Sequence, residues 1–325
     1  MKIGVVGTFI RDRILPWEGK LKGKPVESIG GIFFTVSFLA NLLDSSAEIC
    51  PVCFVGEDFY DEVVEQLAVY DNVRFSGIKI LPRQNTQVTL TYTSPQDREE
   101  ITTPPMPALG YEELSLLEDA HAIEVNLITG ADVDLMSLKK FRQQSNSLIY
   151  LDFHSHALGI SPEGKRFYQR PKDWEEWINL ADVLQLNEME ARTLAGYSRA
   201  LPKEILLNFG KEILQKHPFI CHITLAEKGS YGFFKINNRV QVKRFKAEQI
   251  APIVDMIGCG DAFAAGFLVN YLSTKDVIEA TKFANKVAGR NCTFVGSSGI
   301  KEIQELLQGN KLKFKFYGKF KTIKK

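Results

Sequence analysis

A glycine-rich turn beside an aspartate is the segment of this sequence best suited to chemistry. Residues 255–267 read DMIGCGDAFAAGF, in which Gly258 and Gly260 flank Cys259 and Asp261 follows directly. Glycine allows the backbone to turn tightly and leaves its N–H groups uncovered by side-chain atoms. The turn therefore offers hydrogen-bond donors to a ligand, next to a carboxylate that can accept a proton.

A helix is predicted to begin at this turn. Phe263, Phe267 and Tyr271 recur at intervals of four residues, which is the spacing of one helix face. Uncovered N–H groups and the positive end of the helix dipole make a helix N-terminus a binding site for anions such as phosphate. The alternative interpretation is a glycine turn in which Asp261 only caps the helix. This segment alone favours neither interpretation.

Length and composition restrict the class of protein. The chain has 325 residues, of which 45% are hydrophobic and 24% charged, and this is typical of a globular protein with one large α/β domain or two domains. The net charge of +1 predicts no general attraction to nucleic acid or to a membrane. No apolar run approaches the roughly 20 residues of a membrane span. The five cysteines are few and odd in number, which favours a reducing compartment, so we expect a cytoplasmic protein.

Strand-like and helix-like segments alternate along the chain, which predicts an α/β fold with a mostly parallel sheet covered by helices. The predicted strands are residues 2–7, 48–56, 121–130, 147–153, 181–187 and 220–226. The predicted helices are residues 33–43, 61–70, 136–145, 188–196 and 203–216.

Two segments, residues 13–29 and 78–105, interrupt this alternation. The second contains TQVTLTYTS, whose period of two and many threonines are typical of a half-exposed strand. We expect both segments to form a small β-sheet lid, and two ordinary long loops are the alternative. The α/β core would then comprise residues 1–12, 30–77 and 106–310. Residues 311–325 alternate lysine and phenylalanine, which predicts a solvated edge strand or a basic tail, with binding to an anionic surface as the alternative.

Polar residues and glycines follow several of the predicted strands. In an open parallel sheet, ligands bind beyond the carboxyl ends of the strands. The residues expected to converge at that edge are Asp12, Gly30, Gly31, Asp152, Asn187, Glu190, Thr224 and Asp261. The sequence therefore predicts one ligand site built from distant parts of the chain.

Several motifs, taken in order, resemble those of the ribokinase-type or PfkB family of carbohydrate kinases. DMIGCGDAFAAGF is similar to the C-terminal signature of the family, although Met256 and Cys259 replace its usual threonine and alanine. SIGGIFFTVSFLANL, FVGEDFYDEVVEQL, LNEMEARTLAG and TLAEKGSYGF are similar to further family segments. The resemblance implies a three-layer α/β/α ribokinase-like fold with a small β-sheet lid. It also implies ATP-dependent phosphorylation of a hydroxymethyl-type alcohol on a small sugar or polyol.

The resemblance assigns roles to the residues of the glycine turn. Asp261 would take the proton from the acceptor hydroxyl, and the amides of Gly258, Cys259 and Gly260 would form an anion hole for the transferring phosphoryl group. Phosphoryl transfer depends mainly on positioning and on neutralising charge, which such a turn can supply. Asp255 would contribute to a site for a monovalent cation such as K⁺, as in family members that have one.

The donor side would hold ATP and magnesium. Asn187 and Glu190 would hold Mg²⁺ through water, which suits a cation that keeps much of its hydration shell. Their spacing at a helix start is also that of a capping box, and the two roles are compatible. Thr224, Gly229 and Asn187 would border the nucleotide. The sequence lacks the Gly-x-x-x-x-Gly-Lys-Ser/Thr loop, so the nucleotide would meet a helix N-terminus and open loops instead.

The acceptor side would include Asp12, Gly30, Gly31 and Thr35. Asp12 is expected to accept hydrogen bonds from acceptor hydroxyls, because the matching aspartate of the family contacts sugar hydroxyls. Thr35 stands where the family often has an asparagine that contacts the sugar. This substitution leaves the identity of the acceptor open.

Two alternatives to a sugar kinase remain at this point. Phe33, Phe34 and Phe38 make one helix start unusually aromatic; they either pack in the core or form a stacking wall for a ring, and the latter would favour a nucleoside kinase of the same fold. A catalytically inactive ligand-binding member is the alternative from a different class, although Asp261, Asn187 and Glu190 argue against it. The exposed edge of the lid also predicts a homodimer that pairs through the lid.

Overall fold

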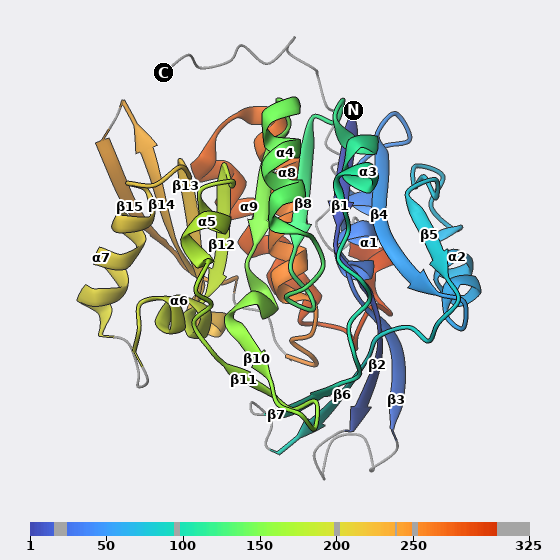
Figure 1. The fold of residues 1–325 in the computed structure, drawn as a ribbon. Coiled ribbons are helices and arrows are strands. Elements are labelled where there is room, and N and C mark those ends of the chain that lie inside the picture. The colour runs from blue at the N-terminus through green and yellow to red at the C-terminus, as the bar shows by residue number, and fades with distance from the viewer. Residues whose placement is uncertain (16–24, 94–97, 198–201, 238, 249–252, 304–325) are drawn as a thin grey trace.

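A large central sheet forms the middle layer of the computed structural model, which describes residues 1–15, 25–93, 98–197, 202–237, 239–248 and 253–303. Its strand order is β15-β14-β13-β12-β9-β8-β1-β4-β5 (Figure 1). Seven strands pair in parallel: β1 (Lys2–Val6), β4 (Glu48–Gly56), β5 (Ile78–Leu81), β8 (Ala122–Asn126), β9 (Leu148–Asp152), β12 (Val183–Asn187) and β13 (Ile220–Thr224). The antiparallel strands β14 (Ser230–Ile236) and β15 (Arg239–Phe245) complete one edge. The predicted mostly parallel sheet is confirmed.

Helices cover both faces of this sheet, so the molecule has three layers. One face packs on α1 (Phe33–Leu42), α2 (Tyr60–Leu67), α8 (Cys259–Thr274) and α9 (Val277–Asn291). The other packs on α3 (Tyr111–Leu114), α4 (Leu135–Gln144), α5 (Trp174–Ile178), α6 (Glu188–Leu194) and α7 (Lys203–Ile213). Short 3₁₀ turns lie at Ser115–Leu117, His154–Ala157, Ala226–Lys228 and Ile300–Glu302.

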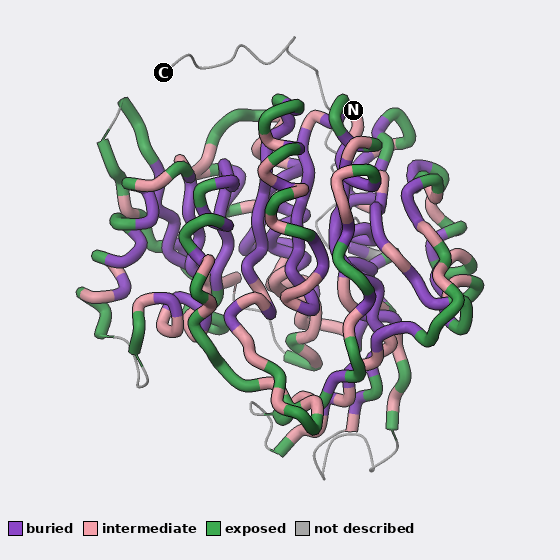
Figure 2. Tube along the Cα trace, in the orientation of Figure 1, coloured by how far each residue is buried: buried purple, intermediate pink, exposed green. Residues whose placement is uncertain are grey.

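The central strands are buried along both faces, as Figure 2 shows. In β9, Leu148 and Tyr150 face one helical layer, whereas Ile149 and Leu151 face the other. Side chains of a strand alternate between its faces, so a strand covered on both sides reads as a continuous apolar run. This is why the buried strands appear in the sequence as continuous apolar runs such as LIYL rather than as alternating apolar and polar residues.

A second, smaller sheet projects from the carboxyl edge of the central sheet. Its order is β3 (Val26–Gly31), β2 (Phe9–Leu15), β6 (Gln87–Tyr92) and β7 (Arg98–Thr102). A hairpin of β10 (Leu158–Ile160) and β11 (Arg166–Tyr168) lies beside β7 through the bridge between Ile101 and Lys165 (Figure 1). This sheet occupies the place expected for the lid, next to the ends of the core strands.

The bounds of the small sheet differ from the predicted segments 13–29 and 78–105. Residues 9–12 and 30–31 belong to its strands, and Ile78–Leu81 pairs with β4 of the central sheet instead. The start of the small sheet is hard to recognise in the sequence, because the apolar run of β1 continues into β2 after only two residues. Residues 16–24 of the first segment and the predicted basic tail, residues 311–325, lie outside the described residues.

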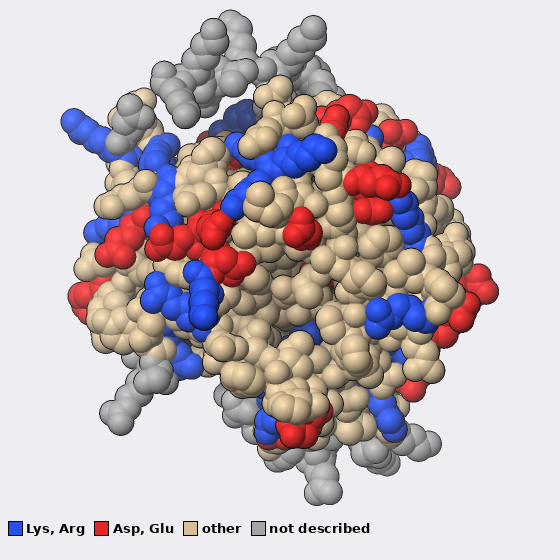
Figure 3. Space-filling model, viewed as in Figure 1, with Lys and Arg blue, Asp and Glu red and all other residues tan. Residues whose placement is uncertain are grey.

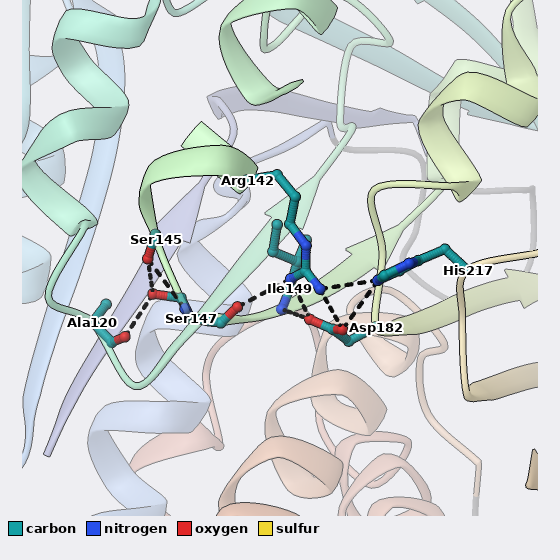
Figure 4. A network of polar contacts seen from close by, with 7 residues as sticks. All are labelled: Ala120, Arg142, Ser145, Ser147, Ile149, Asp182 and His217. Atoms are coloured by element: carbon teal, nitrogen blue, oxygen red, sulfur yellow. Dashed lines mark hydrogen bonds and ion pairs between the residues drawn. The ribbon is translucent and has the colours of Figure 1, made fainter. Parts of the chain in front are cut away.

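A polar network joins the elements at the opposite, amino edge of the sheet. Asp182, directly before β12, accepts both terminal N–H groups of Arg142 at 2.6 and 2.8 Å and the backbone N–H of Ile149 at 2.9 Å (Figure 4). His217 Nε2 lies 2.9 Å from Arg142 Nη2. Burial opposes ionisation of Asp182, but His217 and Arg142 outweigh it and lower its pKa. The network therefore fixes α4 to two central strands, far from the ligand edge.

Candidate active site

A cavity of about 1080 Å³ opens between the carboxyl edge of the central sheet and the small sheet. The predicted site residues that line it are Asp12, Gly31, Asp152, Asn187, Glu190, Thr224, Gly258, Cys259, Gly260 and Asp261. Gly30, Thr35, Gly229 and Asp255 are absent from the lining formed by the described residues. The fold thus brings most of the predicted residues together at one edge, as expected for an open parallel sheet.

The glycine turn begins α8 as predicted. Gly258 is the N-cap, with φ of +78°, and no side chain caps the helix, so the alternative role of Asp261 as a cap is not observed. A Cβ atom at Gly258 would lie 2.5 Å from Phe34, so both the backbone and the packing require glycine. The Cys259 N–H donates to the Met256 carbonyl at 3.3 Å. One of the three predicted anion-hole amides therefore also closes the turn.

Asp261 is held from behind by two hydrogen bonds to one oxygen. Thr35 Oγ1 donates to Asp261 Oδ1 at 3.2 Å, and Asn126 Nδ2 donates to the same atom at 2.9 Å. Burial raises the pKa of Asp261 to about 7, although the bonds from Thr35 and Asn126 partly oppose this. A carboxyl group with a pKa near neutrality is suited to act as a base at physiological pH.

Thr35 lies in a different place from the one predicted. It is fully buried on α1 and contacts Asp261 and Glu124 rather than the cavity. A residue in the first turn of α1 points toward α8 because the two helices pack side by side. Thr35 therefore hydrogen-bonds to Asp261 and is absent from the cavity lining formed by the described residues.

Gln185 connects the glycine turn to the neighbouring strand. Its Nε2 donates to Asp152 Oδ2 at 2.8 Å and to the Gly260 carbonyl at 3.2 Å, while its Oε1 accepts from Tyr150 Oη at 2.6 Å. Burial, Glu190 and Asp261 together raise the pKa of Asp152 well above its usual range. The sequence analysis did not identify Gln185, because a single glutamine in a buried strand is not part of a recognisable motif.

Asn187 and Glu190 form the predicted capping box at the start of α6. Asn187 Oδ1 accepts from the Glu190 N–H at 2.8 Å, and Glu190 Oε2 accepts from the Asn187 N–H at 2.8 Å. Burial raises the pKa of Glu190 to about 8 despite these bonds. This buried carboxyl group lines the cavity and has no cationic partner in the described part of the chain. It therefore fits a cation ligand, since a bound cation would favour its ionised form.

The remaining residues predicted for the donor side shape the backbone. Thr224 ends β13, lines the cavity and donates from Oγ1 to the Leu186 carbonyl at 3.4 Å. Gly229 has φ of +87°, and a Cβ atom there would lie 2.1 Å from the Phe245 carbonyl. Asp255 accepts the N–H groups of Ile257 at 3.1 Å and Gly296 at 2.9 Å, so it joins the loop before α8 to the loop after α9.

The part of the cavity predicted to bind the acceptor is charged and comes largely from the small sheet. Asp12 is 7% exposed, and burial raises its pKa to about 7, with Arg98 opposing this. Glu100 is paired with Arg98 at 2.9 Å and with Arg166 at 3.3 Å. A Cβ atom at Gly30 would lie 1.9 Å from Asp12 Oδ2, so this glycine makes room for the carboxyl group. The sequence analysis missed both arginines because they lie on different β elements.

The aromatic helix start is divided between core and cavity. Phe33, Phe34 and Phe38 are all buried in the core, and of these three only Phe34 also lines the cavity. A stacking wall of three rings is therefore not present. One ring, from Phe34, lines the cavity beside Gly258.

Comparison with known proteins places these features in a family. The chain matches the model of the pfkB family carbohydrate kinases over residues 2–303. A search of curated proteins found no match. Among the described residues, no helix is both long and apolar enough to cross a membrane.

Three solved structures illustrate the shared fold. A pyrophosphate-dependent kinase in the ribokinase family is 18% identical, with 91% of this chain and 96% of that chain covered and a TM-score of 0.73. Arabidopsis thaliana ribokinase complexed with ribose and ATP is 19% identical, with 95% and 99% covered and a TM-score of 0.72. Schistosoma mansoni adenosine kinase in complex with 2-fluoroadenosine is 18% identical, with 91% and 96% covered and a TM-score of 0.71. The fold is the predicted α/β ribokinase fold, and because the family model matches nearly the whole chain, this protein belongs to the pfkB family of carbohydrate kinases.

Proposed function

We propose that this protein is an ATP-dependent kinase that phosphorylates a hydroxymethyl-type alcohol of a small sugar or polyol. The observation that carries the proposal is the position of Asp261. Its carboxyl group lines the cavity at the first turn of α8, faces the acceptor half that contains Asp12, and has a pKa near 7. A base, an anion-binding helix start and a polar acceptor pocket therefore meet in one cavity.

The proposed reaction needs positioning and charge neutralisation rather than covalent catalysis. Asp12 accepts hydrogen bonds from acceptor hydroxyls and orients the reactive hydroxyl toward Asp261. Thr35 and Asn126 occupy Oδ1 of Asp261, so Oδ2 is the oxygen that accepts the proton from the hydroxyl. The backbone N–H groups at Gly258 and Gly260, together with the dipole of α8, stabilise negative charge on the transferring phosphoryl group.

The donor side is proposed to lie along α6, β13 and the end of α9. Asn187 and Thr224 would border the nucleotide, while Gly229 holds the turn that follows β13. Asn187 and Glu190 would hold Mg²⁺ through water, and such an ion neutralises charge on the donor phosphates. Asp255 joins two loops near the start of α8, and we propose K⁺ as the monovalent cation that would bind there. The small sheet of β3, β2, β6 and β7, which replaces the predicted lid bounds 13–29 and 78–105, is proposed to close over the acceptor as a lid.

A screen of donors and acceptors tests the proposed activity. Purified protein would be assayed for ADP release from ATP against sugars, polyols and nucleosides, and in parallel for phosphate release with pyrophosphate, because one similar structure is a pyrophosphate-dependent kinase. We expect turnover with ATP and a sugar or polyol that is lost in Asp261→Asn. Turnover only with pyrophosphate would reject the donor, and no acceptor-dependent turnover with either donor would reject the function.

A nucleoside kinase is the second candidate. Phe34 lines the cavity beside Gly258 and could stack on a base, and an adenosine kinase shares the fold. A preference for nucleosides over sugars in the same screen, abolished by Phe34→Leu, would favour this alternative. A catalytically inactive binding protein would show ligand binding without turnover.

We further propose that the protein is cytoplasmic, acts on small molecules rather than nucleic acid or membranes, and pairs as a homodimer through the small sheet. Figure 3 shows lysine, arginine, aspartate and glutamate side chains interspersed on the viewed face, without a dominant sign. Strand β3 is an edge of the small sheet, with β2 as its only partner among the described strands, and an unpaired edge can accept another strand. Light scattering after gel filtration would give the oligomeric state, and a monomer would reject the dimer.

A further inference from the structure

A buried carboxyl group, Glu124, lies directly behind the base. Glu124 is on β8, is fully buried, and its Oε1 lies 3.3 Å from Thr35 Oγ1. The same hydroxyl lies 3.2 Å from Asp261 Oδ1. Glu124 therefore contacts the base through one shared hydroxyl, and it does not line the cavity formed by the described residues.

The shared hydroxyl restricts where the protons can be. A threonine hydroxyl has one hydrogen to donate, so it cannot donate to both carboxyl groups at once. If Thr35 donates to Asp261, then Thr35 Oγ1 must accept from Glu124, which requires a proton on Glu124. If Thr35 donates to Glu124 instead, Asp261 must carry the proton and cannot act as a base.

The surrounding hydrogen bonds favour the first arrangement. Asn126 donates to Asp261 Oδ1, the same oxygen that faces Thr35, and an oxygen that accepts two donors is stabilised in its ionised form. Glu124 has no comparable support, because its Oε2 is buried without a hydrogen-bond partner among the described residues. An ionised carboxylate in that position would carry unpaired buried charge, which is very costly.

The titratable groups around Glu124 also favour its protonated form. The groups that face Glu124 are Asp261 from α8 and Asp152 and Tyr150 from β9, and the adjacent residue of β1 is the apolar Val5. None of these groups is cationic. Burial, Asp261 and Asp152 raise the pKa of Glu124 well above its usual range, against a smaller opposing effect of Thr35.

From this geometry we propose that Glu124 is a positioning residue that stays protonated and, through Thr35, favours the ionised form of Asp261. The proposal rests on the proposed role of Asp261 as the base. Glu124 donates to Thr35, which fixes the direction of the Thr35 hydroxyl, and Thr35 in turn donates to Asp261. The arrangement supplies a neutral donor behind the base in a site where a second negative charge would oppose ionisation of Asp261.

The first test is spectroscopic and needs no substrate. The infrared difference spectrum between wild type and Glu124→Gln, recorded at neutral pH, should show loss of the C=O stretch of a protonated carboxylic acid. Asp12, Asp152 and Glu190 contribute equally to both proteins and cancel in the difference. Loss of carboxylate bands alone would show that Glu124 is ionised and would overturn the proposal.

The second test follows the acid limb of the pH profile of kcat/KM. Thr35→Val removes a donor to the ionised base and should move the limb upward by about one pH unit, because such a bond is worth about 1–2 pKa units. Thr35→Ser should restore it. Glu124→Leu removes the donor to Thr35 and should raise the midpoint pH of the acid limb by a smaller amount. If Glu124 were ionised, its removal would lower this midpoint instead.

A double-mutant cycle tests whether Glu124 acts through Thr35. Glu124→Leu combined with Thr35→Val should move the limb no further than Thr35→Val alone, and additive shifts would reject the indirect role. Melting temperatures identify variants that do not fold, in which case Glu124→Gln and the infrared spectrum decide. If no acceptor supports turnover but the infrared band is present, the proposed function fails while the proton arrangement stands.

Discussion

Gly258 lies so close to the ring of Phe34 that a Cβ atom on the glycine would come within 2.5 Å of the ring carbon Cδ1. The same residue has φ of +78° at the N-cap of α8. Gly258 thus combines a left-handed backbone with a close contact, at the turn proposed to hold the phosphoryl group. The contact links the first turn of α1 to that of α8, so a side chain at position 258 must displace one of them.

Gly258→Ala is expected to lower both stability and turnover. A non-glycine residue in this backbone conformation costs about 1–3 kcal/mol, and displacement of the turn would misalign its N–H groups, so we expect at least a tenfold fall in kcat. Gly260→Ala is the matched control for stability, because a Cβ atom there would meet its nearest neighbour at 3.4 Å. Equal losses of melting temperature in both variants would contradict this explanation.

The pH dependence of turnover should report the base. Because burial raises the pKa of Asp261 to about 7, kcat/KM should fall below about pH 7 as the carboxylate gains a proton. Asp261→Asn should lower kcat by about 10²–10⁴-fold while leaving ATP affinity, measured by calorimetry, almost unchanged. A variant that kept more than a tenth of wild-type turnover would show that Asp261 is not the base.

Asp12→Ala should weaken acceptor binding selectively. The side chain is 7% exposed within the acceptor half, and hydrogen bonds to a charged group are worth about 1.5–3 kcal/mol each, so KM for the acceptor should rise at least about tenfold. KM for ATP should hardly change. Glu27→Gln, an exposed position on the neighbouring strand β3, should change neither constant. A comparable rise in both constants for Asp12→Ala would exclude an acceptor-specific role.

Glu190→Gln should raise the magnesium concentration needed for half-maximal rate. In the wild type this concentration should also fall as pH rises toward 8, because burial raises the pKa of Glu190 to about 8 and a proton competes with the cation. The variant should lose that pH dependence. An unchanged magnesium requirement with a lower melting temperature would instead assign Glu190 to capping of α6 alone.

Asp182→Asn should destabilise the fold without affecting the site chemistry. It removes the charge that Arg142 and His217 contact, and we expect a loss of about 1.5–3 kcal/mol near neutral pH. The folded-state pKa of Asp182 is lowered, so its stabilisation is present above the unfolded pKa and is lost as pH falls through the folded value. The difference in melting temperature from wild type should therefore shrink on acidification. Glu176→Gln, which breaks an exposed pair with Lys139, should cost under about 1 kcal/mol.

The sequence by itself determined the parts of this protein that depend on local pattern. Apolar runs of strand length alternate with helical periodicity, and this alone indicated the mostly parallel sheet. The glycines of residues 255–267 indicated the start of α8, because a tight turn with uncovered N–H groups needs residues without side chains. Asn187 and Glu190 also indicated the start of α6 from local sequence, because a capping box is made within one helical turn.

Only the tertiary structure decided which polar groups meet around Asp261. Thr35, Asn126 and Glu124 are ordinary residues in their own segments, yet Thr35 lies 226 positions from Asp261 and 89 from Glu124 in the sequence. Thr35 itself turned away from the acceptor because α1 packs against α8, and no local pattern records that packing. The raised pKa values of Asp261 and Glu124 arise from burial between layers, which exists only once distant segments have assembled and excluded water.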